Sequence, residues 1–247
     1  MKKTVLLLLV SLLAGTSFVK AQTNAQLFYD FGSDRKYVTL TLEMFKGDNW
    51  GSTYFFIDQD FNYHKSNGDK NLAPGGTYFE ISRALNFWKD SKLAPLSLHV
   101  EYNGGIYKNY PVNHAGLFGL EYFMHSKDFN NTLTLQALYK TIKATDSEVP
   151  MQLTAVWGCK DLFGLKGVTF SGFADFWWET HNVDYQADGT CDVKKTVFIT
   201  EPQLWYNVGS LVGVENFNVG TEIELSNNFG STGGFKCRPC LGVKWIF

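Results

Sequence analysis

The sequence predicts an all-β protein, specifically a transmembrane antiparallel up-and-down β-barrel of about 12 strands. Three observations predict this fold. Apolar and polar residues alternate along nearly the whole chain after residue 21, the chain begins with an export signal, and it ends on an alternating segment that stops at Phe247. Gly is frequent, Pro is rare and aromatic residues make up 16% of the chain, a composition that favours strands and tight turns.

Residues 1–21 are expected to be a signal peptide and residues 22–247 the barrel. Lys2 and Lys3 give a positive start, an apolar core follows from Val5 to Ala14, and Ala21 is a small residue before the expected cleavage point. The core is too short to span a bilayer, which needs about 20 residues in a helix. The alternative is an uncleaved anchor helix.

The same alternation defines each strand in turn. In residues 37–44 every second residue is apolar, and the residues between them are Thr39, Thr41 and Glu43. A helix would scatter these apolar residues around its circumference. Such segments give twelve candidate strands, near residues 24–31, 36–45, 51–61, 76–87, 96–104, 114–125, 131–142, 150–159, 167–181, 196–208, 216–227 and 235–247.

The connections also fit a membrane barrel. Short ones, such as 46–50, 127–130 and 160–164, alternate with longer polar ones at 62–75 and 182–195. Outer-membrane barrels have short periplasmic turns and longer outside loops, so the expected location is the outer membrane of a Gram-negative bacterium. Two prolines, Pro202 and Pro239, interrupt strands and are expected at bulges or strand ends.

A soluble β-sandwich would alternate in the same way, so the ends of the strands decide between the two folds. Amphipathic rings prefer headgroup depth, and aromatic residues lie near strand ends on the apolar face: Tyr102, Tyr139, Trp157, Trp178, Tyr206 and Trp245. The alternating end of the chain resembles the closing-strand signal of bacterial outer-membrane proteins. Membrane lipid and, through Phe247, the barrel-assembly machinery are therefore expected partners.

In a membrane barrel the polar face lines the interior. Inward-projected carboxylates outnumber bases by about two to one, so pairing cannot neutralise them all, and unpaired charge in a dry interior is too costly. A hydrated lumen follows, although any single acid could instead belong to a structural pair. The expected lumen-lining or solute-lining residues are Glu43, Tyr54, Asp58, Glu80, Arg83 if a bulge turns it inward, Glu101, Glu121, Asp175, Trp177, Glu201, Glu222 and Glu224.

Aromatic faces with acceptors nearby suit a planar, neutral, hydrogen-bonding solute better than an anion. The chain is therefore expected to be a narrow passive channel for small solutes. The alternative is a non-conducting barrel that binds a ligand or partner through its loops. The net charge of −2, without a basic run, argues against nucleic acid as a partner.

Several stretches together resemble the nucleoside-specific channel-forming outer-membrane proteins, the Tsx-like barrels, and in particular a divergent Bacteroides-type branch. They cover nearly the whole mature chain in order: residues 34–43, 47–50, 54–58, 78–83, 162–164, 170–177 and 241–247. The resemblance implies a twelve-stranded barrel that passes nucleosides through a narrow slot lined with aromatic and ionisable residues. By motif position, it implies that Glu43, Asp58, Glu80, Arg83, Asp175 and Trp177 line this slot. The chain departs from the family in its loop lengths and in its four cysteines.

The cysteines suggest one disulfide. Cys237 and Cys240 are spaced like a redox or zinc half-site, but the helix or second pair that such a site needs is missing, so neither metal nor cofactor is expected. On an extended strand these two lie about 10 Å apart, beyond disulfide reach. A Cys191–Cys237 bridge is expected, with Cys240 as the second choice of partner, and Cys159 is expected to be free.

No enzyme motif accompanies this pattern. A lipid-acting hydrolase would need a Ser–His pair with an orienting partner, and no Ser nucleophile signature accompanies the five His, which are His64, His99, His114, His125 and His181. Asp175 and Glu179 would lie about 13 Å apart on one strand, too far for a glycosidase pair. The sequence therefore predicts a protein that is not an enzyme.

Overall fold

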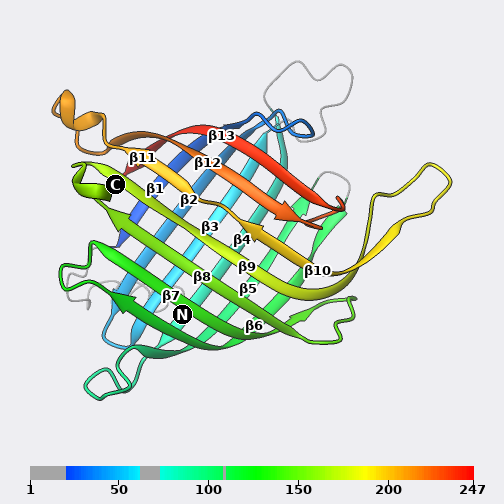
Figure 1. The fold of residues 1–247 in the computed structure, drawn as a ribbon, viewed down its shortest axis with the longest axis horizontal. Coiled ribbons are helices and arrows are strands. Elements are labelled where there is room, and N and C mark those ends of the chain that lie inside the picture. Colours follow the sequence, from blue (N-terminus) through cyan, green and yellow to red (C-terminus); the bar gives the residue numbers. More distant parts are fainter. Residues whose placement is uncertain (1–20, 62–72, 108–109) are drawn as a thin grey trace, which may run out of the picture.

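The computed structural model describes residues 21–61, 73–107 and 110–247, which form a closed antiparallel β-barrel (Figure 1). The barrel closes because β13 (Phe235–Ile246) pairs with both β1 (Gln22–Asp30) and β12 (Phe217–Asn227). The expected fold class is confirmed. The expected signal peptide lies outside the described residues, except for Ala21. Among the described residues, no helix is long and apolar enough to cross a membrane.

The remaining strands follow one another around the wall and pair with their neighbours in sequence, except that β10 and β11 each pair with β9 and β12. Their bounds are β2 (Val38–Asp48), β3 (Gly51–Phe61), β4 (Pro74–Leu85), β5 (Leu96–Tyr107), β6 (Tyr110–His125), β7 (Asn131–Ile142), β8 (Met151–Lys160), β9 (Val168–Val183), β10 (Asp192–Thr200) and β11 (Gln203–Tyr206). Two short 3₁₀ turns, η1 (Leu162–Gly164) and η2 (Gly209–Leu211), lie in the connections.

Strands β10 and β11 together make one crossing of the wall, so thirteen strands give twelve crossings. Glu201 and Pro202 separate them, yet no residue is inserted, because Thr200 lies opposite Ala174 and Gln203 lies opposite Ser171. Pro202 therefore marks a strand end, as expected.

The expectation for Pro239 was wrong, because β13 continues through it. The carbonyl oxygen of Pro239 accepts the N–H of Phe31 at 2.9 Å, just past the end of β1. The N and O atoms of a strand residue point to the same side, so the missing N–H of Pro239 faces the place where β1 has already ended.

The strands present two different faces. On one face large apolar side chains such as Leu42, Ile57, Ile81 and Phe118 are exposed, which is the pattern of a surface that meets hydrocarbon. The six expected strand-end aromatic residues also lie on this face. Four are exposed, namely Tyr102, Tyr139, Tyr206 and Trp245, and two are half-buried, namely Trp157 and Trp178.

The other face encloses the lumen and is not uniformly polar. Three clusters of buried apolar residues pack inside the barrel: Phe28 with Trp205 and Cys240, Ala115 with Leu117 and Leu138, and Trp177 with Val197 and Ile199. Of these residues, only Trp177 was expected to face inward. These clusters narrow the space that remains for water.

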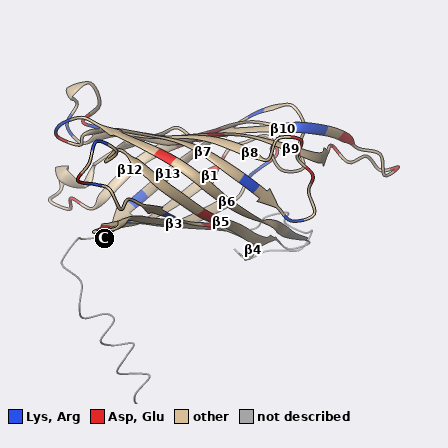
Figure 2. Cartoon of the chain, turned by 90° about the horizontal axis from the view of Figure 1, so that it is seen from below, with Lys and Arg blue, Asp and Glu red and all other residues tan. Residues whose placement is uncertain are grey.

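Strand β10 extends outward with β9 as a ribbon beyond the barrel (Figure 1). Charged residues of both signs gather at its outer end (Figure 2). There Lys194 pairs with Asp192 at 3.2 Å, and Lys195 pairs with Glu148.

Candidate solute-lining site in the barrel lumen

Eleven of the twelve expected lining residues lie on the lumen face, ten of them within strands and Glu201 in the break between β10 and β11. They alternate along their strands with the exposed apolar residues of the outer face: Glu43, Tyr54, Asp58, Glu80, Glu101, Glu121, Asp175, Trp177, Glu201, Glu222 and Glu224. Most are half-buried rather than fully buried, so their side chains line space that solvent can still reach.

Arg83 is the exception, and its expected place in the lumen was wrong. No register shift occurs near it in β4, so it shares the outer face with Ile81. Its guanidinium binds both carboxylate oxygens of Asp48 at 2.8 Å and donates to Thr53 Oγ1 at 3.0 Å. Asp48 ends β2 beside the short turn to β3, so Arg83 reaches along the outer wall to the rim of the barrel.

One part of the lumen wall combines aromatic rings with carboxylates. The centroid of the Phe56 ring lies 6.2 Å from that of Tyr54 and 5.9 Å from that of Tyr78, and we name these three residues the aromatic ladder. The Tyr78 hydroxyl donates to Glu80 Oε1 at 2.6 Å, and Thr41 donates to Asp58 Oδ1 at 2.5 Å. Flat apolar surfaces and strong acceptors thus lie side by side on β3 and β4.

A second part of the wall is an internal acid–base set. His99 lies with Nδ1 2.8 Å from Glu121 and Nε2 3.1 Å from Glu101, and it is almost fully buried. A doubly protonated imidazole can donate to both carboxylates at once. Glu101 and Glu121 are therefore paired with His99 as part of the structure. This is the alternative role that the sequence left open for any single acid.

Two lysines lie over tryptophan rings inside the barrel. Lys140 Nζ is 3.8 Å from the centroid of Trp177, and it also donates to Gln152 Oε1 at 2.6 Å. Lys244 Nζ lies 4.1 Å from the centroid of Trp205. Cation–π contacts of this kind hold a lysine ammonium without a carboxylate partner.

Within the described part of the chain, the six remaining lining acids make no ion pair. No Lys, Arg or His nitrogen lies within 4.0 Å of five of them, which we name the acidic belt: Glu43, Asp58, Glu80, Asp175 and Glu222. Glu201 makes no such contact either, but it interacts electrostatically with Arg35 and is not counted in the belt. The hydrogen-bond donors to the belt are neutral: Gln26 donates to Glu43, Thr154 to Asp175 and Gln203 to Glu222. Acids of the belt interact with one another electrostatically, as Asp58 does with Glu222 and Glu43.

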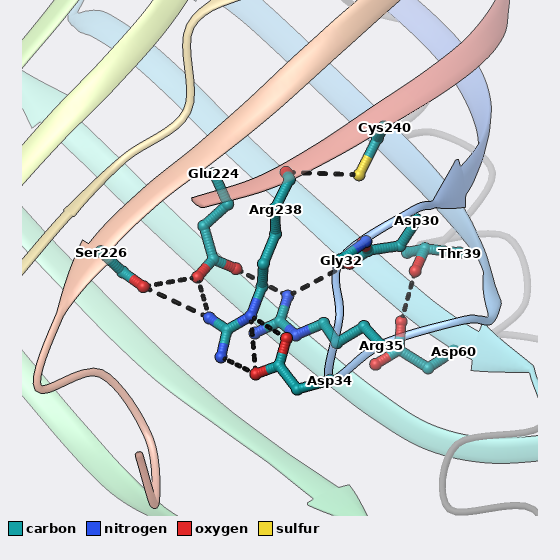
Figure 3. Close-up of polar contacts among 10 residues, drawn as sticks. All are labelled: Asp30, Gly32, Asp34, Arg35, Thr39, Asp60, Glu224, Ser226, Arg238 and Cys240. Atoms are coloured by element: carbon teal, nitrogen blue, oxygen red, sulfur yellow. Dashed lines mark hydrogen bonds and ion pairs between the residues drawn. The ribbon is translucent and has the colours of Figure 1, made fainter. Parts of the chain in front are cut away.

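At the end of the lumen formed by the end of β1 and the start of β13, a network of ion pairs lies inside the barrel (Figure 3). Arg238 lies between Asp34 and Glu224, and its Nη2 is 2.6 Å from Asp34 Oδ2. Arg35 Nη1 lies 2.6 Å from Glu224 Oε2 and 3.8 Å from Asp30 Oδ2. The hydrogen bond from Arg238 lowers the pKa of Asp34 to about 2.

Asp34 and Arg35 were not expected in the lumen, because both lie in the loop that joins β1 to β2. Alternation assigns faces only inside a strand, so it says nothing about a loop that folds inward. One feature of the sequence could have indicated their position. An acid and a base stand side by side in a short loop, next to strands that carry charges of both signs.

The expected Cys191–Cys237 bridge was also wrong, since all four cysteines are free, Cys159 among them as expected. Cys237 lies opposite Leu225 on β12, and Leu225 lies opposite Thr200 on β10, so Cys237 and Thr200 are at the same height on the wall. Cys191 precedes Thr200 by nine residues of extended chain, roughly 30 Å along the strand. The ribbon of β9 and β10 therefore carries Cys191 far beyond disulfide reach of Cys237.

The side-chain partners of the described histidines are not those of a Ser–His pair. His99 faces carboxylates, His114 contacts the Tyr102 hydroxyl, and the hydrogen bonds of His125 and His181 go to backbone carbonyls. None of these reaches a Ser hydroxyl, and His64 lies outside the described residues. Within the same residues, no group of three or more His, Cys, Asp or Glu is placed to hold a metal ion.

Comparison with known proteins gives a family and a fold. A family model described as "Domain of unknown function (DUF5020)" matches residues 21–247. No curated protein sequence matches the chain.

Solved structures similar to this chain are outer-membrane barrels. The NanC porin has a TM-score of 0.53 and 11% identity, over 90% of this chain and 98% of the porin. The outer membrane phospholipase of Salmonella typhi has a TM-score of 0.53 and 12% identity, over 96% of each chain, and phospholipase A of Escherichia coli has 0.51 and 14%, over 90% and 92%. At these identities the similarity establishes the barrel fold, which porins and phospholipases share.

Proposed function

We propose that this chain, which belongs to the DUF5020 family, is a narrow passive channel for small solutes in the outer membrane of a Gram-negative bacterium. The observation that carries the proposal is the acidic belt. Charged carboxylates that make no ion pair are tolerated only where water or mobile cations can reach them. The belt faces inward on many strands, so it would surround a continuous aqueous path.

The aromatic ladder supports a more specific solute class. Tyr54, Phe56 and Tyr78 offer flat rings, and Asp58 and Glu80 offer acceptors beside them. A planar, neutral solute with hydroxyl or amino donors fits this surface, and anions are repelled by the acids. Nucleosides have these properties, in agreement with the Tsx-like pattern of the sequence.

The surroundings follow from the same barrel. Its exposed apolar wall would contact membrane lipid, and the terminal Phe247 would be recognised by the barrel-assembly machinery during insertion. Both assignments are part of the proposal.

Liposome swelling tests the channel and its preference together. Purified protein in liposomes should admit a nucleoside such as uridine faster than the matching nucleotide, because the phosphate adds negative charge. Protein-free liposomes and liposomes with heat-unfolded protein are the controls. Equal rates for uridine and its monophosphate would overturn the solute class, and no swelling with a folded barrel would overturn the channel.

One observation favours a second candidate, a non-conducting barrel that binds a ligand or partner through its loops. Asp30, Glu224, Ser226 and Arg238 are all buried, so the network in Figure 3 closes part of the lumen. If it closed the entire cross-section, no solute would pass. The absence of swelling, with a folded barrel, is the result that this candidate predicts.

A further inference from the structure

The loop that joins β1 to β2, residues 31–37, is tied into the lumen. Arg238 Nε lies 3.1 and 3.2 Å from the two carboxylate oxygens of Asp34, and Nη2 lies 2.6 Å from one of them. The N–H of Gly32 donates to Asp30 Oδ1 at 2.6 Å, and a methyl group at Gly32 would meet that oxygen at 2.9 Å. The start of the loop therefore packs too closely for a side chain at Gly32.

The loop places Arg35 beside two acids of the lumen wall, Glu201 and Glu224. Thr200 lies opposite Leu225 and Gln203 lies opposite Glu222, so the unbroken register places Glu201 opposite Glu224. Like charges directly opposite each other on neighbouring strands destabilise a sheet. Arg35 contacts Glu224 at 2.6 Å and interacts electrostatically with Glu201. Arg238 also pairs with Glu224, so Arg35 is the cation that acts on both acids of the pair.

The two arginines of the network differ in exposure. The Arg238 side chain is 3% exposed and fixed between Asp34 and Glu224, whereas the Arg35 side chain is 26% exposed. An ion moving through the lumen would therefore meet the guanidinium of Arg35, while that of Arg238 is enclosed by its partners.

We propose that Arg35 is the residue that limits cation selectivity at this end of the lumen, with Asp34 and Arg238 positioning it. This inference rests on the proposed channel function. Its positive charge offsets Glu201 and Glu224, so a permeating cation meets less negative potential here than at the acidic belt. Removing that charge would extend the negative potential to the mouth of the lumen.

Reversal potentials across a planar bilayer under a KCl gradient test this. R35Q is expected to raise the K⁺ to Cl⁻ permeability ratio at least about threefold, since one elementary charge is lost in a confined, low-dielectric space. The double variant R35Q/E201Q restores the net charge and is expected to return the ratio close to that of the wild type. R83Q removes an arginine from the outer wall and should leave the ratio unchanged.

The outcomes separate the two claims. An unchanged ratio in R35Q, with conductance retained, overturns the role of Arg35 and leaves the channel intact. A wild-type barrel that folds, as judged by circular dichroism, but never conducts overturns the channel itself. If R35Q fails to fold, the single variant E201Q still decides, because removing one acid beside Arg35 should lower the ratio, and an unchanged ratio contradicts the proposal.

Discussion

The rings of Phe28 and Trp205 lie with their centroids 5.5 Å apart, although two strands separate the strands that carry them. The register explains this contact. Trp205 lies opposite Gly220, Gly220 opposite Gly242, and Gly242 opposite Phe28, so two glycines leave the inner wall bare between the two aromatic residues. Both rings are buried and lie over this bare wall.

Adding a methyl group at Gly242 should disrupt this packing. An alanine Cβ there would meet Phe28 Cδ1 at 2.5 Å. G242A is expected to lower the free energy of unfolding by about 1–3 kcal/mol, the usual cost of overpacking. Urea unfolding in detergent measures it, with G47A as the control because a methyl group at Gly47 meets nothing closer than 4.0 Å. Equal stability of G242A and the wild type would show that the rings do not need the glycines.

The carboxylates of the acidic belt should be replaceable without unfolding the barrel. Asp58, Glu80 and Asp175 each accept a hydroxyl hydrogen bond, from Thr41, Tyr78 and Thr154 respectively. An amide oxygen can accept the same bond, so D58N, E80Q and D175N should fold and show a lower preference for cations over anions. Reversal potentials report the preference, and a collapse of stability would mean that these acids are structural.

Those three acids were predictable from the sequence, because they lie inside strands where alternation fixes the face. Arg83 was misplaced because it lies on the apolar face of its strand, and its expected inward position needed a bulge that β4 does not have. Inward apolar residues such as Leu117 and Leu138 were missed, because alternation alone does not show that apolar side chains fill part of a barrel interior.

Long-range relationships were also beyond the sequence. The contact between Phe28 and Trp205 depends on the register of four strands, and Arg35 reaches the lumen through a loop with no period. The failed Cys191–Cys237 bridge has the same cause, because sequence separation does not show how far the ribbon of β9 and β10 extends past the rim.

Acid should weaken the link between the loop and the wall. The hydrogen bond from Arg238 lowers the pKa of Asp34 to about 2 from its ordinary 3.8, so the carboxylate stabilises the fold fully above about pH 4. This contribution is lost as the pH falls toward 2. D34N should therefore be less stable than the wild type at pH 6, with the difference shrinking near pH 2. Urea unfolding at both pH values measures this, and a difference independent of pH would exclude the ion pair as its cause.

The cysteines should all react as thiols. After denaturation without reductant, intact-mass analysis with a maleimide should find four adducts per chain, because all four cysteines are free. Two adducts without reductant and four with it would show that two of the cysteines form a disulfide, which contradicts this prediction.

The central claim is that the polar face encloses a water path, and accessibility at two adjacent positions tests it most directly. Asp58 faces the lumen and Ile57 the outer wall. D58C and I57C are each introduced into a chain without native cysteines. The conductance of each variant is recorded in a planar bilayer while a charged, membrane-impermeant thiol reagent is added. The account predicts a stepwise fall in conductance for D58C and none for I57C. Open D58C channels that are unaffected by the reagent, or folded barrels that never conduct, would contradict it.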